Sequence, residues 1–389
     1  MDTLAFTQPF GIFVKNTADE VTFVPNKLPP AIIYDESLIS LIAEASLELG
    51  NLSGIGLIIP NPHLLIRPYL TQEAVLSSKI EGTQASILDI FRFEAGEHIL
   101  KEERETKGID EVVNYVIALN KCLENVKEGK KVDIEMIKDA HGILMENIVG
   151  HPMLKPGEFR KVQNWIGKPG TKIEDATYVP PPPEKINELL VDLEKFIQNP
   201  PGRIPTLVQL AMIHYVFEAI HPFIDGNGRI GRLIIPVLLA ERKLLEQPLL
   251  YLSAYIERNK TEYYALLLSV SQKGDWINWI RFFLRGVIVQ SRDATNNIQR
   301  LLSLKTKYEQ KLTEIRASYS MIKTVEYLFS NPIITVTRIA KHLGITYPPA
   351  KKTIEKLLEI EILKERDDEK ERGKSYFAHE ILSVLTSHR

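Results

Sequence analysis

The sequence HPFIDGNGRIGR, at residues 221–232, is the stretch from which the rest of the chain can be interpreted. Two apolar segments flank it, residues 206–220 and 229–245, and their hydrophobic side chains recur at helical spacing. Pro222 disfavours helical backbone at the residue before it, so we expect the first helix to end there. The sequence therefore predicts two buried helices joined by a tight loop at residues 225–228.

The polar groups of this loop suit a phosphorylated ligand. The start of the second helix offers unpaired N–H groups and the positive end of the helix dipole, which favour anions. Gly226 and Gly228 let the backbone turn and approach a phosphate, while Asn227 tolerates left-handed backbone and offers an amide donor. Arg229 and Arg232 lie three residues apart on one helix face and suit bidentate phosphate contacts.

Two side chains at the mouth of the loop carry catalytic chemistry. Asp225 is a hard oxygen ligand that can hold Mg²⁺ against the same phosphates. His221 has a reference pKa near neutrality and can accept a proton from an attacking hydroxyl group. The alternative is an ordinary glycine-rich turn with surface arginines and a core histidine. So many functional groups in one short stretch argue against that alternative.

The stretch resembles the signature of the Fic family, HPFxDGNGRxxR, and matches it at every position. Enzymes of this family typically transfer AMP from ATP to a hydroxyl group of a protein. The resemblance implies that His221 is the general base and that Asp225 binds Mg²⁺, with ATP as the substrate. The nucleotide-binding residues that it implies are Gly226, Asn227, Gly228, Arg229, Ile230, Gly231 and Arg232.

A second motif precedes this core, on a helix expected at about residues 67–84. Ser77 and Glu81 lie four residues apart and face the same way, and Gly82 follows as a breaker. A solvated acidic residue is the alternative for Glu81. The segment SSKIEG resembles the Fic inhibitory motif: Ser or Thr, three variable residues, Glu, then Gly or Asn. If Glu81 pairs with Arg232, that arginine is withdrawn from the γ-phosphate and the bound nucleotide is misaligned.

Residues 156–179 indicate a β-hairpin, because glycines punctuate short runs rich in valine, isoleucine, tryptophan and tyrosine. In the Fic family such a hairpin is a flap beside the active site, which implies main-chain pairing with the target protein at residues 171–178. The docking residues expected there are Thr171, Lys172, Ile173 and Tyr178. An ordinary structural hairpin is the alternative.

Tyr264 lies near the start of a helix that follows the signature region. Resemblance to related Fic enzymes suggests that Tyr264 lines the adenosine pocket, with Tyr263 and Asn278 as neighbours. Simple packing in a helical core is the alternative, because aromatic side chains more often serve that purpose.

Composition sets broad limits on the class of protein. The 389 residues allow two or three domains, and the net charge of −2 gives no argument for a polyanionic partner. The one cysteine, Cys122, excludes an internal disulfide bond and suits a small buried side chain. No signal-like segment opens the chain and no apolar run approaches membrane-spanning length, so we expect a cytoplasmic protein with no membrane partner.

The expected fold is mainly α, a Fic-fold helical bundle with a β-hairpin flap and a C-terminal winged-helix domain. The expected parts are an N-terminal helical region with the inhibitory helix (1–109), the Fic core (110–290), a linker helix (291–319) and the winged-helix domain (320–389). Within the last part we expect helices at 320–329, 336–343 and 347–359, with wing strands at 362–365 and 375–378.

A winged helix commonly places its third helix in the DNA major groove. Residues 321–389 carry 12 Lys and Arg against 10 Asp and Glu, which is a weak basic balance. A protein-interaction or dimerisation module is therefore favoured over DNA binding, and a homodimer is among the expected partners.

Several functions remain in competition. Auto-inhibited AMP transfer to Ser, Thr or Tyr hydroxyls of target proteins, and to the chain itself, is favoured by the intact signature. Removal of AMP, with the inhibitory glutamate positioning water, is an alternative within the family. Phosphoryl transfer of the Doc branch is disfavoured by Gly226 and Gly228, where that branch departs from the pattern. A DNA-binding regulator with a vestigial nucleotide site is disfavoured by His221, and no Walker-type string indicates an ordinary ATPase.

Overall fold

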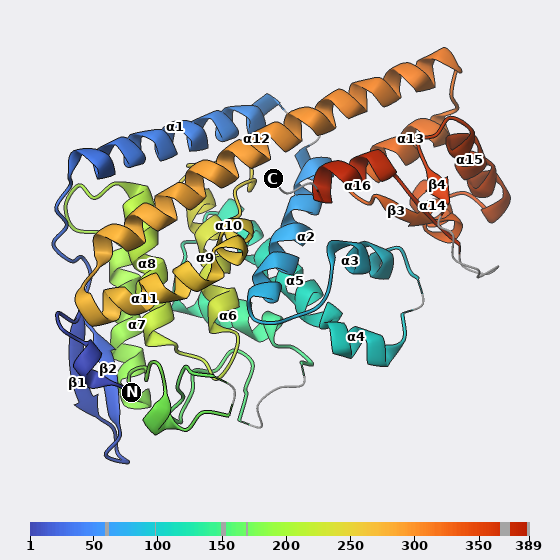
Figure 1. Ribbon diagram of the computed structural model, residues 1–389. Coiled ribbons are helices and arrows are strands. Elements are labelled where there is room, and N and C mark those ends of the chain that lie inside the picture. Colours follow the sequence, from blue (N-terminus) through green and yellow to red (C-terminus); the bar gives the residue numbers. More distant parts are fainter. Residues whose placement is uncertain (59–61, 98, 149–152, 169, 366–373, 387–389) are drawn as a thin grey trace.

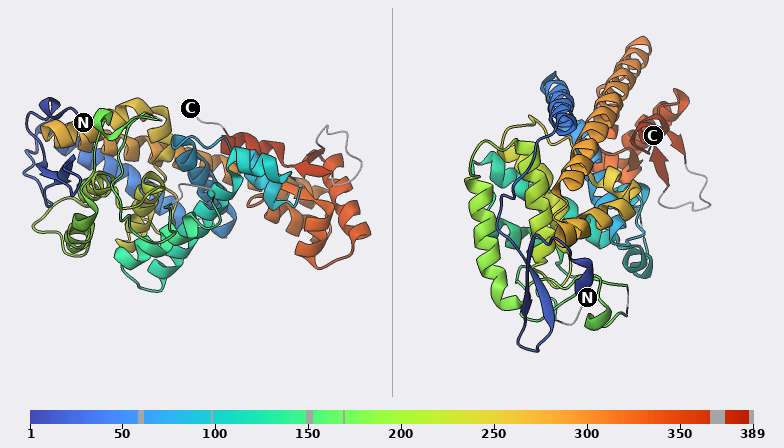
Figure 2. Two further views of the ribbon diagram at one scale, coloured as in Figure 1. Left: turned by 90° about the horizontal axis from the view of Figure 1, so that it is seen from below. Right: turned by 60° about the vertical axis from the view of Figure 1, so that its left-hand side comes forward.

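The computed structural model describes residues 1–58, 62–97, 99–148, 153–168, 170–365 and 374–386. Over these residues the chain is mostly helical, with a hairpin near the N-terminus and a small sheet near the C-terminus (Figure 1). The long helix α12 (Trp276–Glu314) runs from the main helical body out to that sheet (Figure 2).

The centre of the body is formed by α8 (Thr206–Ile220) and α9 (Asn227–Glu241). Nearly all of α8 is buried, as expected for a helix that is apolar on every side. The helix predicted at 206–220 is therefore confirmed, and the one predicted at 229–245 starts and ends a few residues earlier. The helices around this pair are α5 (Ile109–Lys127), α6 (Ile134–Leu144), α7 (Ile186–Gln198), α10 (Ser253–Arg258) and α11 (Lys260–Lys273).

Helix α1 (Glu36–Ile58) lies along α12 (Figure 1). Arg292 of α12 forms ion pairs of 2.8 Å with both Glu44 and Glu48 of α1. By length and composition alone, residues 36–57 could cross a membrane, which corrects the expectation that no apolar run approaches that length. Packing against α12 gives α1 a role inside the fold.

The segment that resembles the inhibitory motif begins on α2 (Pro62–Ile80), which is followed by α3 (Ile87–Glu94) and α4 (Lys101–Lys107). The helix expected at 67–84 thus begins earlier and ends earlier. Glu81 and Gly82 lie in the turn after α2, because Gly82 has a φ of +108°, which a right-handed helix cannot accommodate.

The N-terminal region begins with a hairpin that precedes its helices. After a 3₁₀ turn (Thr3–Ala5), strands β1 (Gly11–Lys15) and β2 (Val21–Pro25) form an antiparallel hairpin. Phe23 fixes this hairpin against the body, because its side chain is fully buried and its N–H donates to the carbonyl of Val179 at 2.9 Å.

The flap is not a two-stranded hairpin. In the described part of residues 156–179 the only strand-like pairing is one isolated antiparallel bridge, between Ile166 and Tyr178, and Ile173–Asp175 is a 3₁₀ turn. The side chains of this segment bind backbone outside it: Gln163 Nε2 donates to Pro180 O (3.0 Å) and Asn164 Nδ2 donates to Phe223 O (3.0 Å). A second 3₁₀ turn, Pro183–Lys185, leads into α7.

The C-terminal segment follows α12 without a separate linker helix, because α12 is one continuous helix across the expected boundary at 291. Its helices are α13 (Tyr319–Leu328), α14 (Val336–Leu343), α15 (Tyr347–Glu359) and α16 (His379–Thr386). Its antiparallel sheet has the order β3 (Ile333–Thr335), β5 (Ser375–Phe377), β4 (Lys364–Glu365). The expected wing tip at 366–373 lies outside the described residues, and the winged-helix assignment stays a prediction.

Candidate active site

The loop between α8 and α9 begins at His221, which caps α8. Its N–H donates to Phe217 O at 3.1 Å, and its φ of +50° is left-handed. Non-glycine residues are uncommon in this region of backbone space, and such strained residues cluster at functional sites. The chain therefore turns at His221 itself rather than at Pro222.

The side chain of Arg160 holds this turn through hydrogen bonds to backbone carbonyl oxygens. Its guanidinium is buried and donates to the carbonyl oxygens of His221 (Nε, 2.9 Å), Pro181 (Nη2, 2.5 Å) and Val162 (Nη1, 3.2 Å). Its backbone N–H donates to Pro222 O at 2.9 Å. Sequence analysis did not find this residue, because one arginine 61 positions before His221 carries no local signal.

The imidazole of His221 is held as a neutral base. Its Nδ1 lies 3.3 Å from Glu218 O, and because a carbonyl oxygen can only accept, the proton is assigned to Nδ1. Burial, together with the positive charge of Arg160, lowers the pKa of His221 to about 4. At neutral pH, Nε2 therefore carries an available lone pair.

The side chain of Asn227 binds the backbone of the loop through two hydrogen bonds. Its Oδ1 accepts from the N–H of Phe223 (2.8 Å) and its Nδ2 donates to the carbonyl of the same residue (2.9 Å). The expectation for Asn227 was left-handed backbone and a donor for phosphate. The structure corrects the backbone expectation, because Asn227 begins α9 and Gly226 before it has the left-handed φ of +79°. Nucleotide binding by Asn227 stays a prediction.

His141 of α6 supports the same loop. Its Nδ1 accepts from the N–H of Gly157 (2.9 Å), so Nε2 carries the proton and donates to Asp225 O (3.1 Å). The ring stacks on Phe223 with a centroid distance of 3.7 Å. Burial lowers the pKa of His141 to about 4, so this ring is neutral.

The start of α9 is close to the inhibitory segment. A Cβ placed on Gly228 would lie 2.3 Å from Oε1 of Glu81 and 2.9 Å from Nη1 of Arg232. A Cβ on Gly231 would lie 2.2 Å from Oε1 of Glu218. Carboxylates therefore already approach the helix at these glycines, where a phosphate was expected to do so.

Arg232 is bound to the end of α2. Its Nε donates to Ser77 Oγ (3.0 Å), and its Nη2 donates to Ser77 O (2.9 Å) and to Glu81 Oε1 (2.6 Å). The ion pair expected between Glu81 and Arg232 is therefore present. Nη1 of Arg232 is buried and has no hydrogen-bond partner within the described residues.

The Glu81–Arg232 pair is strongly coupled. Burial opposes the charged form of both groups, but each charge stabilises the other, so the pKa of Glu81 falls below its usual value and the pKa of Arg232 rises. Both groups stay ionised over the physiological range. A phosphate oxygen must therefore compete with a charged carboxylate for Arg232.

Arg229 is also occupied. Its Nη1 lies 2.5 Å from Glu111 Oε2, and its Nη2 lies 3.5 Å from Asp225 Oδ1. Thr83, just after the inhibitory turn, donates its hydroxyl to the same oxygen of Glu111 (3.3 Å). Glu111 was not expected from the sequence, because a lone glutamate at the start of a helix is usually a favourable dipole contact.

Asp225 suits Mg²⁺ only in combination with a phosphate. Within the described residues no group of three or more His, Cys, Asp and Glu side chains is arranged to hold a metal ion. Mg²⁺ is commonly bound by one or two carboxylates plus phosphate oxygens, and the Asp225 side chain is half exposed beside the helix start. The residues present therefore fit a metal ion that arrives with a nucleotide.

A cavity of about 750 Å³ lies beside the loop, and within the described residues its lining includes neither Asp225 nor Arg229. His221, Arg232 and Glu81 line it, together with Tyr264 and the bridged residue Ile166. Its volume lies in the range of small-molecule sites.

Other predicted residues lie elsewhere. Ile230 is fully buried in the core. Tyr178 lines the cavity but is buried, and its hydroxyl donates to Ala219 O at 2.9 Å, so its side chain serves the fold. Thr171, Lys172 and Ile173 do not line the cavity within the described residues, and Ile173 begins the 3₁₀ turn.

The aromatic prediction is partly corrected, at Asn278. Tyr264 and its expected neighbour Tyr263 both line the cavity. Tyr264 is 42% exposed, and Tyr263 is fully buried and donates its hydroxyl to His214 Nε2 at 2.8 Å. Asn278 does not line the cavity, because its amide donates to Asp275 at the start of α12 (3.0 Å).

Glu218 is a further carboxylate in the cavity wall that the sequence analysis missed. Its Oε1 is buried and has no hydrogen-bond partner among the residues described. Burial raises its pKa to about 7, with Arg232 opposing and Glu81 reinforcing the shift. It could have been suspected only from its position three residues before His221, close to one helical turn.

Comparison with known proteins places this arrangement in a family. The model described as "Fic/DOC family N-terminal" matches residues 39–124, and the model described as "Fic/DOC family" matches residues 131–239. A solved Fic family protein from Desulfovibrio desulfuricans is 21% identical with a TM-score of 0.57, covering 90% of this chain and 98% of that one. A Fic domain containing signalling protein from Bacteroides thetaiotaomicron is 17% identical with a TM-score of 0.52, covering 67% and 97%. The chain belongs to the Fic/DOC family.

Curated relatives carry names that describe an activity. A probable protein adenylyltransferase of Aquifex aeolicus is 23% identical over 278 residues, which cover 71% of this chain and 77% of the relative. The protein adenylyltransferase Fic of Drosophila yakuba is 28% identical over 185 residues, which cover 47% of this chain. This chain spans only 32% of the length of that insect protein.

Proposed function

We propose that this protein is an auto-inhibited protein adenylyltransferase, which transfers AMP from ATP to Ser, Thr or Tyr hydroxyls of target proteins and of itself. The observation that carries the proposal is the joint placement of three groups at one cavity: the neutral His221, and Arg232 held by Glu81. The names of the relatives support AMP transfer as the reaction type.

The chemistry follows from the available lone pair of His221. The hydroxyl oxygen of the target attacks the α-phosphorus of ATP, its proton passes to Nε2 of His221, and the bond to pyrophosphate breaks. The N–H groups at the start of α9 face the phosphates. Mg²⁺, held by Asp225 together with the phosphates, would neutralise their charge. A neutral base is needed here, and the depressed pKa of His221 supplies it at neutral pH.

Inhibition follows from competition for one arginine. Arg232 gives Nη2 to Glu81 and Nε to Ser77, so the γ-phosphate lacks this partner while α2 is in place. The nucleotide then settles with its α-phosphate out of line with the attacking hydroxyl, and misalignment suppresses rate heavily. Displacement of Glu81 frees Arg232 for the phosphate.

For the C-terminal segment we keep the winged-helix domain as a proposal. On α15 the exposed Lys351 pairs with Glu355 at 3.7 Å, so part of the basic charge of this helix is neutralised locally. This favours a protein-interaction or dimerisation role over DNA binding.

The test uses ATP labelled on the α-phosphate, with parallel reactions carrying the label on the γ-phosphate. Wild type, Glu81→Gly and His221→Ala are incubated with Mg²⁺, and label on protein is measured. We expect label from the α-phosphate alone, and the most label in Glu81→Gly. Combining His221→Ala with Glu81→Gly should lower this label by at least about a hundredfold. Label from the γ-phosphate would contradict AMP transfer, and no label from either would favour AMP removal or a regulatory role.

A further inference from the structure

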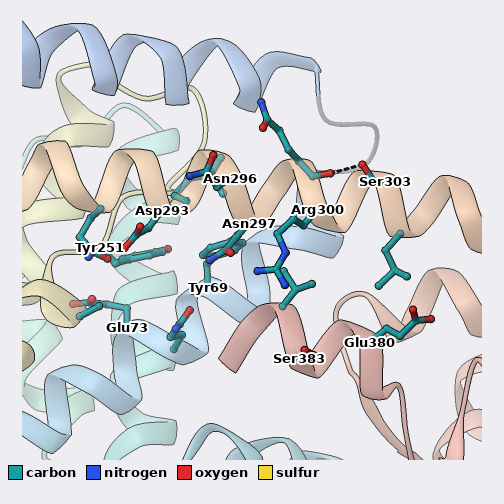
Figure 3. Close-up of a pocket in the computed structure, with 18 of the residues that line it drawn as sticks. Tyr69, Glu73, Tyr251, Asp293, Asn296, Asn297, Arg300, Ser303, Glu380 and Ser383 are labelled. Atoms are coloured by element: carbon teal, nitrogen blue, oxygen red, sulfur yellow. Dashed lines mark hydrogen bonds between the residues drawn. The ribbon is translucent and has the colours of Figure 1, made fainter. Parts of the chain in front are cut away.

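A cavity of about 1090 Å³, larger than the one beside the loop, lies between α2, α12 and α16 (Figure 3). Figure 3 shows Asn297 of α12 and Ser383 of α16 at its wall. Within the described residues its lining includes none of Glu111, Arg229 and Asp225. The contacts of these three side chains with one another therefore belong to the candidate active site.

The guanidinium of Arg229 is shared by two carboxylates. Its Nη1 lies 2.5 Å from Oε2 of Glu111 on α5, and its Nη2 lies 3.5 Å from Oδ1 of Asp225 in the loop before α9. Only 4% of the Arg229 side chain is exposed, and within the described residues it does not line the cavity beside the loop. The charge of Arg229 is therefore directed to the two carboxylates.

The two carboxylates are not equivalent. Glu111 makes the close contact and is 29% exposed, whereas Asp225 lies farther from the guanidinium and is 52% exposed. Oδ1 of Asp225 accepts from the N–H of Gly226 at 2.6 Å, which fixes this carboxylate at the start of α9. A guanidinium binds a carboxylate most strongly in a close, bidentate pair. By taking the close contact, Glu111 keeps Arg229 from closing such a pair with Asp225.

The position of Glu111 is itself fixed by the segment that follows α2. The hydroxyl of Thr83 donates to Oε2 of Glu111, the oxygen that also binds Arg229, at 3.3 Å. A Cβ on Gly108, the residue before α5, would lie 2.6 Å from Cγ2 of Thr83, and this glycine has a φ of +69°. A residue without a side chain lets the start of α5 approach Thr83 this closely. The first turn of α5 therefore carries Glu111 to a defined place beside Arg229.

A metal ion at Asp225 is sensitive to the charge of Arg229. Mg²⁺ is bound by carboxylate and phosphate oxygens, and a cation beside the carboxylate competes for those oxygens and repels the metal ion. Glu111 opposes both effects, because its negative charge lies 2.5 Å from the guanidinium. Residues that support a metal ligand commonly change metal affinity by about ten- to a hundredfold.

We propose that Glu111 is a positioning residue for the metal site: by holding and neutralising Arg229, it keeps the carboxylate of Asp225 open to the Mg²⁺ that arrives with the nucleotide. The proposal deepens the proposed function and rests on it for the role of Asp225. It also gives Arg229 an electrostatic role at Asp225, where the resemblance implied a contact to phosphate.

The test measures the Kd of an ATP analogue with a methylene group between its α- and β-phosphorus atoms, which cannot transfer AMP. Calorimetric titrations with Mg²⁺ and with EDTA give the metal enhancement, which is the Kd in EDTA divided by the Kd in Mg²⁺. The parent and all variants carry Glu81→Gly, so that Arg232 is available. We expect Glu111→Gln to lower the metal enhancement about tenfold, towards the value of Asp225→Asn, because glutamine keeps the size of the side chain and loses its charge.

Asp110→Asn is the matched control. Asp110 precedes Glu111 in the first turn of α5 and pairs with Arg104 instead of Arg229, so this change removes the same charge from the same helix start. The metal enhancement of Asp110→Asn should stay within about twofold of the parent, because an exposed charge without contact to Arg229 is screened.

Arg229→Met separates the proposed role from structural support. Without the guanidinium nothing competes for Asp225, so adding Glu111→Gln to Arg229→Met should leave the metal enhancement unchanged. A structural role of Glu111 would lower the enhancement in both backgrounds. If Glu111→Gln alone does not fold, Arg229→Met alone decides, because its metal enhancement should be no lower than that of the parent.

An unchanged metal enhancement in Glu111→Gln, an equal fall in Asp110→Asn, or a lower value in Arg229→Met overturns the proposal. An unchanged value in Asp225→Asn overturns it as well, and also removes Mg²⁺ binding by Asp225 from the proposed function. If the metal enhancement behaves as expected but α-labelled ATP gives no labelled protein, AMP transfer fails and the positioning role of Glu111 stands.

Discussion

Each hydrogen bond that the Arg160 side chain donates goes to a backbone carbonyl oxygen, and one of these belongs to His221. Burial lowers the pKa of Arg160 to about 10, yet the guanidinium stays charged at neutral pH. This charge depresses the pKa of His221 at the same time as the hydrogen bond fixes its backbone. Arg160 is thus a positioning residue that also keeps the base neutral.

Arg160→Met is expected to reduce kcat for AMP transfer about a hundredfold in the Glu81→Gly background, because a loosened turn misplaces His221. The KM for ATP should change little, since Arg160 does not face the phosphates. The pH profile should also shift, because the pKa of His221 rises when the neighbouring charge is removed.

Lys161→Met is the matched control, because the neighbouring Lys161 is exposed. A kcat for Arg160→Met within twofold of this control, with an unchanged pH profile, would remove Arg160 from the account.

Glu218 gives a prediction at the same scale. Its folded pKa of about 7 lies above its ordinary value of 4.5, so the folded chain loses stability as pH rises between these two values. Glu218→Gln avoids this loss and should be more stable than wild type by about 3 kcal/mol at pH 8. At pH 5 the difference should shrink to about 1 kcal/mol or less. Urea unfolding at the two pH values measures it, and equal stabilities at pH 8 would show that Glu218 is not strained by burial.

At the scale of elements, two residues at and just after the end of α2 bind the side chain of Arg232. Ser77 supplies both its hydroxyl and its carbonyl, and Glu81 supplies a carboxylate from the turn beyond the helix. Because Glu81 lies outside the regular helix, it can move without unwinding α2. Arg232 is therefore bound both by a residue within the helix and by a residue of the turn that follows it.

Ser77→Ala should raise AMP transfer about fivefold, less than Glu81→Gly, because one hydrogen bond to Arg232 is worth about 1 kcal/mol. Ser78→Ala is the matched control, since the hydroxyl of Ser78 is buried and has no partner within the described residues. Initial rates with α-labelled ATP measure both. Equal rates for the two variants would show that Ser77 does not restrain Arg232.

Prediction from the sequence succeeded for elements with strong periodicity. α8, α14 and α15 have the predicted bounds, because apolar spacing and cap residues mark them locally. The predicted flap strands were wrong, because this segment forms a single bridge between Ile166 and Tyr178 and a 3₁₀ turn at Ile173–Asp175, which the local sequence pattern does not mark. A continuous α12 was missed because the change in composition along it resembled a domain boundary.

For the whole molecule, the buried histidines contribute to the response to acid. His141 and His214 are fully buried, and burial lowers their pKa values to about 4 and about 3. The unfolded chain takes up these protons first, so stability is lost as pH falls from 6.5 through 4. In the Glu218→Gln variant, which removes the opposing carboxyl, the loss between pH 7 and pH 5 should be roughly 2 kcal/mol for each histidine. A urea midpoint that does not change between these pH values would contradict this.

The residues of the candidate site also divide into those that the sequence predicted and those that it did not. Residues 221–232 were found together because they are contiguous, and Glu81 was found through a short motif. Glu111 and Arg160 come from distant segments, and nothing in their own neighbourhood distinguishes them from solvated charges. Folding places both against the loop, which sequence spacing alone does not reveal.

The central claim is that Glu81 inhibits by occupying Arg232. The most direct measurement is the initial rate of AMP transfer from α-labelled ATP by wild type, Glu81→Gly and Glu81→Gly with Arg232→Ala. The account predicts that Glu81→Gly is at least about tenfold faster than wild type, because Arg232 becomes available to align the nucleotide. It also predicts that the added Arg232→Ala abolishes the gain. A Glu81→Gly rate no higher than wild type, or a gain that survives without Arg232, would contradict the claim.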